Sequence, residues 1–216
     1  MNRRRQPAEG RRSAERIQQA IEKYHDRSVA FPVGKIECIK LPESLRAALE
    51  RSGRKPRGRF LWIRIARQEL WHCEFRTKTT ATVLKKLTAS TSRFGIGQQE
   101  GSNKTPLGLH RVAKKFGDGL PAGAVFKARV YQGYQWNGKP EDTITSRILW
   151  LDGLEPGFNH GGNIDSFKRY IYIHGTGDQS TLGRPATCGC THLADKDLLP
   201  LYEEVPVGTL VWISRR

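Results

Sequence analysis

The sequence lacks any apolar run approaching the roughly eighteen residues that cross a bilayer. Its charged opening is also not followed by the apolar core of a signal peptide. We therefore expect no transmembrane segment, and no export signal in the sequence as it stands.

Cysteine is scarce too: the four cysteines, at positions 38, 73, 188 and 190, are too few and too unevenly spaced for the disulfide framework of a small secreted domain. A chain of 216 residues can bury a core without such crosslinks.

Acidic residues are outnumbered by basic ones. The chain has 37 Lys and Arg against 21 Asp and Glu, a formal net charge of +16 at pH 7. Such a charge implies attraction to polyanions, and nucleic acid, anionic lipid and acidic cell-wall polymer all qualify. The sequence contains no ribonucleoprotein-type aromatic motif, zinc-finger spacing or convincing recognition helix, so we expect no specific nucleic acid as a partner.

The chain is predicted to consist of a basic, partly helical extension at residues 1–55 and a β-rich domain at residues 56–216. The opening residues are basic and polar and predict a mobile tail. Apolar residues then recur at helical spacing from Ile17 to Tyr24. A second short helix is predicted within LPESLRAALERSG, residues 41–53, which ends in a glycine.

Short aromatic or β-branched segments dominate from residue 59 onward, separated by Gly, Asn and Asp clusters. The predicted strands are RFLWIRI, QELWHCEF, AVFKARVY, SRILWL, RYIYIH and TLVWIS. In this part only DKDLLPLYEEV has a helical pattern. We therefore expect an α+β fold that is mainly β with few helices, a mixed or antiparallel β domain preceded by a small helical extension.

The stretch HGTGDQSTLGRPATCGCTHL, residues 174–193, holds two cysteines one residue apart between two histidines. One interpretation is a Cys₂His₂ metal site made of Cys188, Cys190, His174 and His192. Against it, Cys-x-Cys in a strand sends the thiols to opposite faces, and zinc knuckles usually space their cysteines two to four apart on a turn. We expect no metal. A plainer interpretation makes Cys190 a small buried hydrophobe and His174 a hydrogen-bonded strand-end histidine.

The same stretch also has what a cysteine nucleophile needs, which is a nearby base and donors aimed at an oxyanion. RYIYIHGTG predicts a buried strand that ends at His174, where a side chain is presented at the rim of the sheet. Gly189 directly precedes Cys190, and a residue without Cβ lets the backbone approach a substrate and present its amides.

Three motifs occur in an order that is typical of one enzyme family. The first is a Gly-rich stretch with Thr-Pro-Leu-Gly, in GIGQQEGSNKTPLGLHRV. The second is an Ile-His-Gly-Thr strand end followed by Thr-x-Gly-Cys, in YIHGTGDQSTLGRPATCGCTHL. The third is a Gly-Thr strand near the end of the chain, in PVGTLVWI. Together they resemble the L,D-transpeptidase (YkuD-type) catalytic domain family, and the resemblance covers roughly residues 58–216. It implies an L,D-transpeptidase-like mixed β-sandwich.

The resemblance assigns roles to individual residues. Cys190 matches the nucleophile, His174 its general base, and Gly175 the residue whose carbonyl orients that histidine. The amides of Gly189 and Cys190 would form the oxyanion hole. Thr187 matches a Ser/Thr position that lines the site, with a plain turn residue as the alternative.

Two positions depart from the family's pattern. Cys188 stands where the family commonly has His or Lys, and His192 stands where it almost always has Arg. That arginine is expected to place the substrate or brace the site, and a histidine near pKa 6.5 is only partly charged at neutral pH. We expect His192 to act as a partly charged substitute, with Arg184, Arg169 and Lys168 as further candidates for the missing charge. For each of these three the alternative is a solvated surface residue.

The resemblance implies a cysteine-dependent L,D-transpeptidase without metal or organic cofactor. It would cut a peptidoglycan stem peptide through a thioester acyl-enzyme and pass the acyl group to a neighbouring stem, forming crosslinks between diamino acid residues. The alternatives are an L,D-carboxypeptidase or endopeptidase that uses water, and a catalytically silent wall-binding module. A carbapenem-type inhibitor is a further candidate partner. The implied location is the periplasm or cell-wall face, with the cytoplasm as the alternative, and the sequence does not set the oligomeric state.

Overall fold

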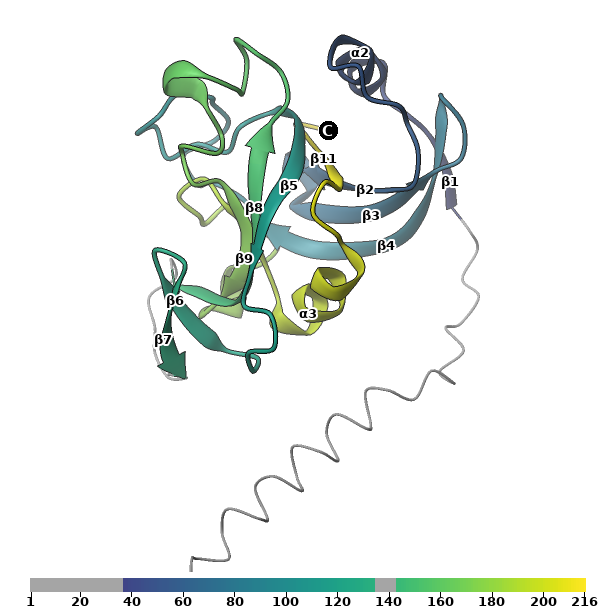
Figure 1. Cartoon of the computed structure of the whole chain (residues 1–216). Helices are drawn as coiled ribbons and strands as arrows, with labels where there is room; N and C mark the ends of the chain where they lie inside the picture. Colours follow the sequence, from purple (N-terminus) through teal and green to yellow (C-terminus); the bar gives the residue numbers. More distant parts are fainter. Residues whose placement is uncertain (1–36, 135–142) are drawn as a thin grey trace, which may run out of the picture. The chain divides into compact units, whose positions relative to one another are not determined.

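The computed structural model describes residues 37–134 and 143–216 (Figure 1). The helix expected from Ile17 to Tyr24 and the basic opening residues lie outside the described residues. The strands are β1 (Glu37–Lys40), β2 (Arg59–Arg64), β3 (Glu69–Phe75), β4 (Thr80–Ser90), β5 (Gly108–Phe116), β6 (Ala124–Lys127), β7 (Val130–Tyr134), β8 (Ile144–Gly153), β9 (Tyr172–Thr176), β10 (Thr191–Leu193) and β11 (Leu210–Ser214). The helices are α2 (Glu43–Arg51) and α3 (Asp195–Glu204), with 3₁₀ turns η1 (Ile65–Arg67), η2 (Gly162–Ile164) and η3 (Gln179–Thr181). Neither α2 nor α3 has the length and apolar character needed to span a bilayer.

The strands pair in the order β5-β11-β2-β3-β4-β10-β9-β8-β6-β7, and β1 pairs with β4. A further pairing of β5 with β8 closes most of this path into a ring. The pairs β10–β9 and β11–β2 are parallel, and the remaining pairs are antiparallel. The expected mainly β fold of mixed strand direction with few helices is therefore confirmed.

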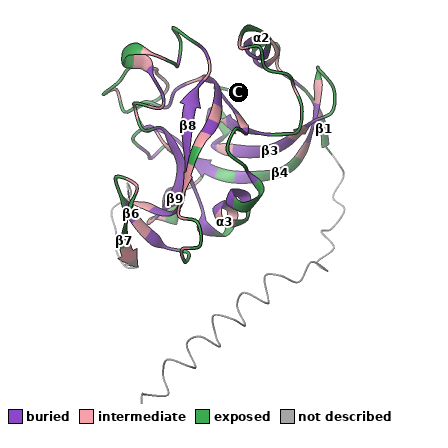
Figure 2. Cartoon of the chain, viewed as in Figure 1, coloured by how far each residue is buried: buried purple, intermediate pink, exposed green. Residues whose placement is uncertain are grey.

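Side chains alternate between two sides along each strand, as the period of a β-strand requires. On β2, Leu61 and Ile63 join the central cluster inside the ring of strands, which also receives α3. Phe60 and Trp62 face the opposite side and pack with α2. The helix was predicted from its apolar spacing, and its buried residues are Leu45, Ala48 and Leu49. Figure 2 shows that the buried residues follow the strands, whereas exposed residues gather in the loops.

A third apolar cluster lies on the outer side of β8 and β9. Its buried members are Ala124, Phe126, Ile148, Trp150 and Tyr172. Partly buried Cys190 packs against this cluster. The next residues along β8, Leu149 and Leu151, face the central core instead. The cysteine that the sequence singles out thus lies at the edge of an aromatic surface.

Two predicted strands differ from the structure. AVFKARVY is a hairpin rather than one strand, because Ala128 and Arg129 adopt left-handed backbone conformations with φ of 47° and 70° between β6 and β7. RYIYIH is extended only from Tyr172 onward. Before it, the amide of Tyr170 bonds the carbonyl of Phe167 in a turn, and Tyr170 itself has φ of 56°.

Candidate active site

The parallel pairing of β9 with β10 brings the two central candidate residues together. The register places His192 opposite His174 and Thr191 opposite Ile173, so Cys190 comes next to the start of β9. The Tyr172 amide donates to Cys190 Sγ at 3.4 Å. Cys190 also packs against the cluster that contains the Tyr172 side chain. Because Tyr172 and His174, two residues apart, share a face of β9, Cys190 lies beside the face that carries His174.

His174 is buried and its ring is fixed by the next residue. Its Nδ1 lies 2.7 Å from the carbonyl oxygen of Gly175. A carbonyl can only accept, so in the neutral ring Nδ1 carries the proton and Nε2 has the lone pair of a base. The contact between the Gly175 carbonyl and the histidine that was expected from the sequence is therefore present.

Position 175 has no room for a side chain. A Cβ there would lie 2.5 Å from Asp195 Oδ1 and 2.6 Å from Thr145 Oγ1. Both atoms belong to buried residues and cannot move aside cheaply. The strand does not end at His174, as was expected, but continues to Thr176. Glycine at 175 lets β9 pack closely enough for the Gly175 carbonyl to hold His174.

Thr187 and Gly189 shape the turn that carries the cysteine. The Thr187 hydroxyl donates to the Cys190 carbonyl at 2.6 Å and accepts from the Gly189 amide at 3.2 Å. Gly189 has φ of +121°, a conformation that L side chains rarely adopt. Because Thr187 is fully buried and its hydroxyl is used within the turn, it positions Cys190 rather than presenting a group to a ligand. The Gly189 amide is likewise engaged inside the turn.

His192 does not have the partial charge that was expected of it. Its ring is buried, with its centroid 4.4 Å from that of His174, and its Nδ1 has no hydrogen-bond partner. Burial, with a smaller contribution from His174, lowers the pKa of His192 to about 2. The residue is neutral at physiological pH, so it cannot replace a cationic arginine.

The buried state of His192 predicts a loss of stability in mild acid. Its pKa is near 6.5 in the unfolded chain and about 2 in the folded one, so between these values only the unfolded chain gains the proton. Stability therefore falls as the pH drops below about 6.5, by about 2 kcal/mol between pH 7.5 and 5. Urea unfolding at both pH values should show this fall in the wild type and a fall smaller by that amount in His192→Phe. Equal pH dependence in the two proteins would contradict the assignment.

The candidate cations lie in two different places. Arg169 and Lys168 line a cavity of about 130 Å³ together with Tyr170 and Cys188. The Arg169 guanidinium is within electrostatic range of Cys190, although burial lowers the pKa of Arg169. Arg184 lines a separate, larger cavity of about 640 Å³. Of the three, Arg169 is the cation whose charge the structure places near the cysteine.

The Cys₂His₂ metal alternative does not form. Cys188 is exposed, and its sulfur accepts from Arg93 Nη2 at 3.4 Å. Among residues 37–134 and 143–216, the ligand atoms that converge within 4.8 Å belong to Asp152, His160 and Asp165, a group that contains neither cysteine. Asp152 is moreover occupied by Arg111, which donates two hydrogen bonds to it, at 3.0 and 2.8 Å.

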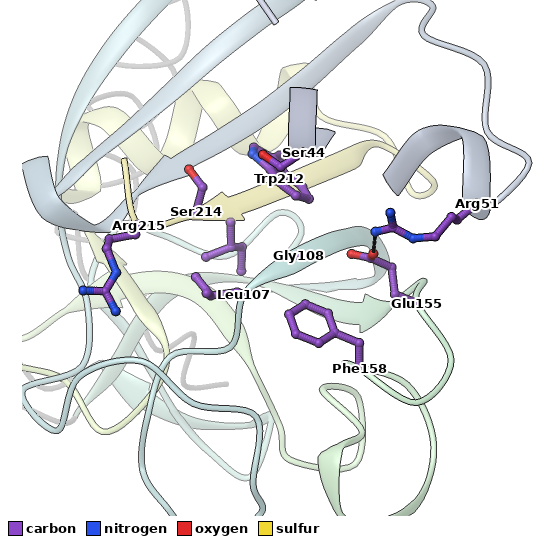
Figure 3. Close-up of a pocket in the computed structure, with 10 residues that line it drawn as sticks. Ser44, Arg51, Leu107, Gly108, Glu155, Phe158, Trp212, Ser214 and Arg215 are labelled. Carbon is purple, nitrogen blue, oxygen red and sulfur yellow. Dashed lines mark hydrogen bonds and ion pairs between the residues drawn. The ribbon is translucent and has the colours of Figure 1, made fainter. Parts of the chain in front are cut away.

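A cavity of about 350 Å³ lies elsewhere, between α2 and β11 (Figure 3). Glu155 points into it but is already paired with Arg51 at 2.6 Å and accepts the Leu109 amide at 2.8 Å. None of the expected site residues lines this cavity. The Glu155 carboxylate anchors a loop. The candidate catalytic residues lie at β9 and β10 instead.

The sequence did not indicate Tyr170 and Tyr172 as parts of the site. The cysteine thiol donates to the Tyr170 carbonyl at 3.5 Å, and the Tyr172 amide donates to the sulfur. Tyr170 is 52% exposed and combines that exposure with a left-handed backbone. Such strain in a non-glycine residue is frequent at functional sites. The alternation of strand residues in RYIYIH could have indicated Tyr172, because it places Tyr172 on the same face of the strand as His174.

The chain matches one family description, the L,D-transpeptidase catalytic domain (YkuD), over residues 58–213. The curated Bacillus subtilis protein YkuD is 34% identical over 62 residues, and the match covers 26% of this chain and 38% of that protein. The structure of Bd1075 from Bdellovibrio bacteriovorus superposes with a TM-score of 0.51 at 13% identity, covering 82% of this chain and 54% of that one. An L,D-transpeptidase from Xylanimonas cellulosilytica has a TM-score of 0.47 at 17% identity, covering 78% of this chain and 68% of that one. The matched part thus spans well under two thirds of the Bacillus and Bdellovibrio relatives.

Proposed function

The chain belongs to the L,D-transpeptidase (YkuD) catalytic domain family, and from this premise we propose that it is a cysteine-dependent L,D-transpeptidase acting on peptidoglycan stem peptides. The observation that carries the proposal is the position of the Cys190 sulfur, held by the Tyr172 amide beside the face of β9 that presents His174. The Gly175 carbonyl fixes the tautomer in which Nε2 of His174 is the base.

In the proposed reaction His174 takes the thiol proton and Cys190 Sγ attacks the carbonyl carbon of the diamino acid residue of the stem. The tetrahedral intermediate collapses to a thioester, and the terminal D-amino acid leaves as an amine that receives the proton from His174. The side-chain amine of a neighbouring stem then attacks the thioester, its proton passes to His174, and the thiolate leaves. The product is a crosslink between two diamino acid residues.

The oxyanion would be stabilised by backbone amides of the turn at residues 188–190. We assign the main contact to the Cys190 amide, which is covalently closest to the reacting sulfur. The Gly189 amide can contribute if it exchanges its 3.2 Å bond with the Thr187 hydroxyl for the oxyanion. In this scheme Thr187 holds the turn, and the reaction uses no metal or organic cofactor.

We place the activity at the periplasmic or cell-wall face, because the proposed substrate lies there. The net charge of +16 suits a polymer rich in free carboxylates. The alternative is the cytoplasm, where released stem peptides would be the substrate. Recovery of the untagged full-length chain in the wall or periplasmic fraction supports the first location, and recovery in the cytosol alone supports the second.

Incubation with purified muropeptides, followed by mass spectrometry of the products, tests the function. Crosslinked dimers that have lost one D-amino acid are expected. Trimmed monomers, or cleaved dimers, would instead indicate an L,D-carboxypeptidase or endopeptidase that uses water as the acceptor. Unchanged muropeptides would indicate a wall-binding module without catalysis.

A further inference from the structure

An aromatic surface adjoins the cysteine, and we call its four rings the aromatic wall: Trp150, Phe167, Tyr170 and Tyr172. Trp150 is its centre, stacked on Phe167 with ring centroids 4.0 Å apart and 5.6 Å from both tyrosines. Cys190 packs against the same cluster, and its sulfur bonds the backbone of Tyr170 and Tyr172. The wall therefore begins at the nucleophile and extends away from it.

Among the described residues, two cations lie over this wall. Lys114 Nζ is 5.6 Å from the ring centroids of Trp150 and Phe167, and Arg129 lies over Trp150 and the two tyrosines that contact the cysteine. The Arg129 guanidinium carbon is 4.7 Å from the ring centroid of Trp150 and 4.9 Å from that of Tyr170. Its Nη1 also donates to the Tyr172 hydroxyl at 2.9 Å. The left-handed backbone of Ala128 and Arg129 in the β6–β7 turn makes this placement a built feature, because such conformations in non-glycine residues are costly.

In the part of the chain that the structure describes, Arg129 contacts two neutral rings and donates to one hydroxyl. No carboxylate among residues 37–134 and 143–216 forms an ion pair with it. A guanidinium has five N–H donors in a planar fork that matches a carboxylate. The described part of the chain thus does not neutralise the charge of Arg129, although the aromatic wall holds its side chain in place.

Tyr172 links Arg129 to the cysteine. Its amide contacts Cys190 Sγ and its hydroxyl contacts Arg129, so the length of one tyrosine separates the two centres. Burial raises the pKa of the Tyr172 hydroxyl. The nearby Arg129 lowers this pKa in part, and the charge of Cys190 raises it. The phenol thus remains protonated within the range of both charges.

We propose that Arg129, supported by Trp150, Tyr170 and Tyr172, is a carboxylate-binding subsite for the free carboxylate of the terminal D-amino acid of the donor peptide. The inference rests on the proposed function, since that carboxylate lies only one residue beyond the carbonyl that Cys190 would attack. A carboxylate bound at this position needs a cationic hydrogen-bond donor. Arg129 supplies it from a hairpin distant in sequence.

Arg169 is the competing cation near Cys190. Its guanidinium is committed to backbone carbonyls, at 3.2 Å from Gly97 and 2.7 Å from Lys104. These bonds make it a brace for the loop at residues 97–104. Within residues 37–134 and 143–216, Arg129 forms no hydrogen bond with a backbone carbonyl, and this difference favours Arg129 as the ligand contact.

The test compares two stem tetrapeptides that differ only in a C-terminal carboxylate or carboxamide. Their binding to full-length Cys190→Ala protein, which cannot turn them over, is measured by calorimetry. We expect the carboxylate peptide to bind roughly 10- to 100-fold more tightly, as for a charge-assisted hydrogen-bonded pair. Arg129→Gln in this background should remove the preference by weakening the carboxylate peptide alone. Lys127→Gln is the matched control, since it removes an exposed cation from the same hairpin and should keep the preference.

Several outcomes would overturn the subsite. They are equal binding of the two peptides, a preference that survives Arg129→Gln, equal weakening of both peptides by that variant, or a preference lost only in Arg169→Gln. Absence of binding by either peptide would overturn it as well. Turnover by the wild type is measured separately. Turnover with no carboxylate preference contradicts the subsite alone, whereas a preference without any turnover contradicts the proposed reaction and leaves the subsite standing.

Discussion

Cys190→Ala is expected to lower turnover of the stem peptide by more than about 10³-fold, as the loss of a nucleophile does in other covalent enzymes. Cys188→Ala is expected to retain most of the activity. The two thiols differ in surroundings: the Cys190 sulfur contacts the backbone of Tyr172 next to His174, whereas Cys188 is exposed beside Arg93. Product mass spectrometry gives the rates. Intact-protein mass after incubation with a carbapenem should show an adduct that depends on Cys190 alone.

The cysteine pair is its own matched control, because both substitutions remove one thiol from the same turn. Similar losses in the two variants would revive a joint role for the cysteines. Elemental analysis of the purified protein is then the direct check, since zinc near one atom per chain would support a metal site. Matching thermal unfolding of both variants and the wild type separates lost chemistry from lost structure.

Local sequence was sufficient to predict both described helices and the strands β2, β3, β8, β9 and β11, whereas β1, β4, β5 and β10 were not predicted. Strand β2 alternates between two apolar environments, and the spacing of Leu45, Ala48 and Leu49 specifies one buried face of α2. The β6–β7 hairpin was missed because its turn contains Ala128 and Arg129, which rarely adopt positive φ, instead of glycine or asparagine. No local pattern marks such a turn.

The candidate site could be predicted only in part from the sequence, because some of its features depend on tertiary contacts rather than on local sequence. The motifs place His174 on β9 and Cys190 directly before β10, which pairs with β9, and the Gly175 contact is local. The charge state of His192 depends on its burial against His174, which requires the tertiary structure. Arg129 comes from a hairpin about sixty residues earlier in the chain, and only its tertiary contacts with Trp150, Tyr170 and Tyr172 connect it with the cysteine.

His174→Gln is expected to lower the rate of thioester formation by roughly 10²- to 10⁴-fold near neutral pH, the range for loss of a general base. Glutamine keeps an N–H that can donate to the Gly175 carbonyl but lacks the basic nitrogen, so β9 is disturbed little. The deficit should shrink as the pH approaches the ordinary thiol pKa of about 8.5, because the thiol then ionises without assistance.

His72→Gln is the matched control for this variant, since it also removes a buried imidazole from a strand but lies on β3, away from the cysteine. It should leave thioester formation within about threefold of the wild type, because a buried residue outside the site acts on stability more than on chemistry. Single-turnover measurements from about pH 6 to 9, with a carbapenem as the acylating probe, follow the step without the acceptor reaction. A deficit of constant size across this range, or an equal deficit in His72→Gln, would contradict a general-base role. In that case His174 would act by supporting the packing of β9 against β10, and the proton would have to leave the thiol by another route.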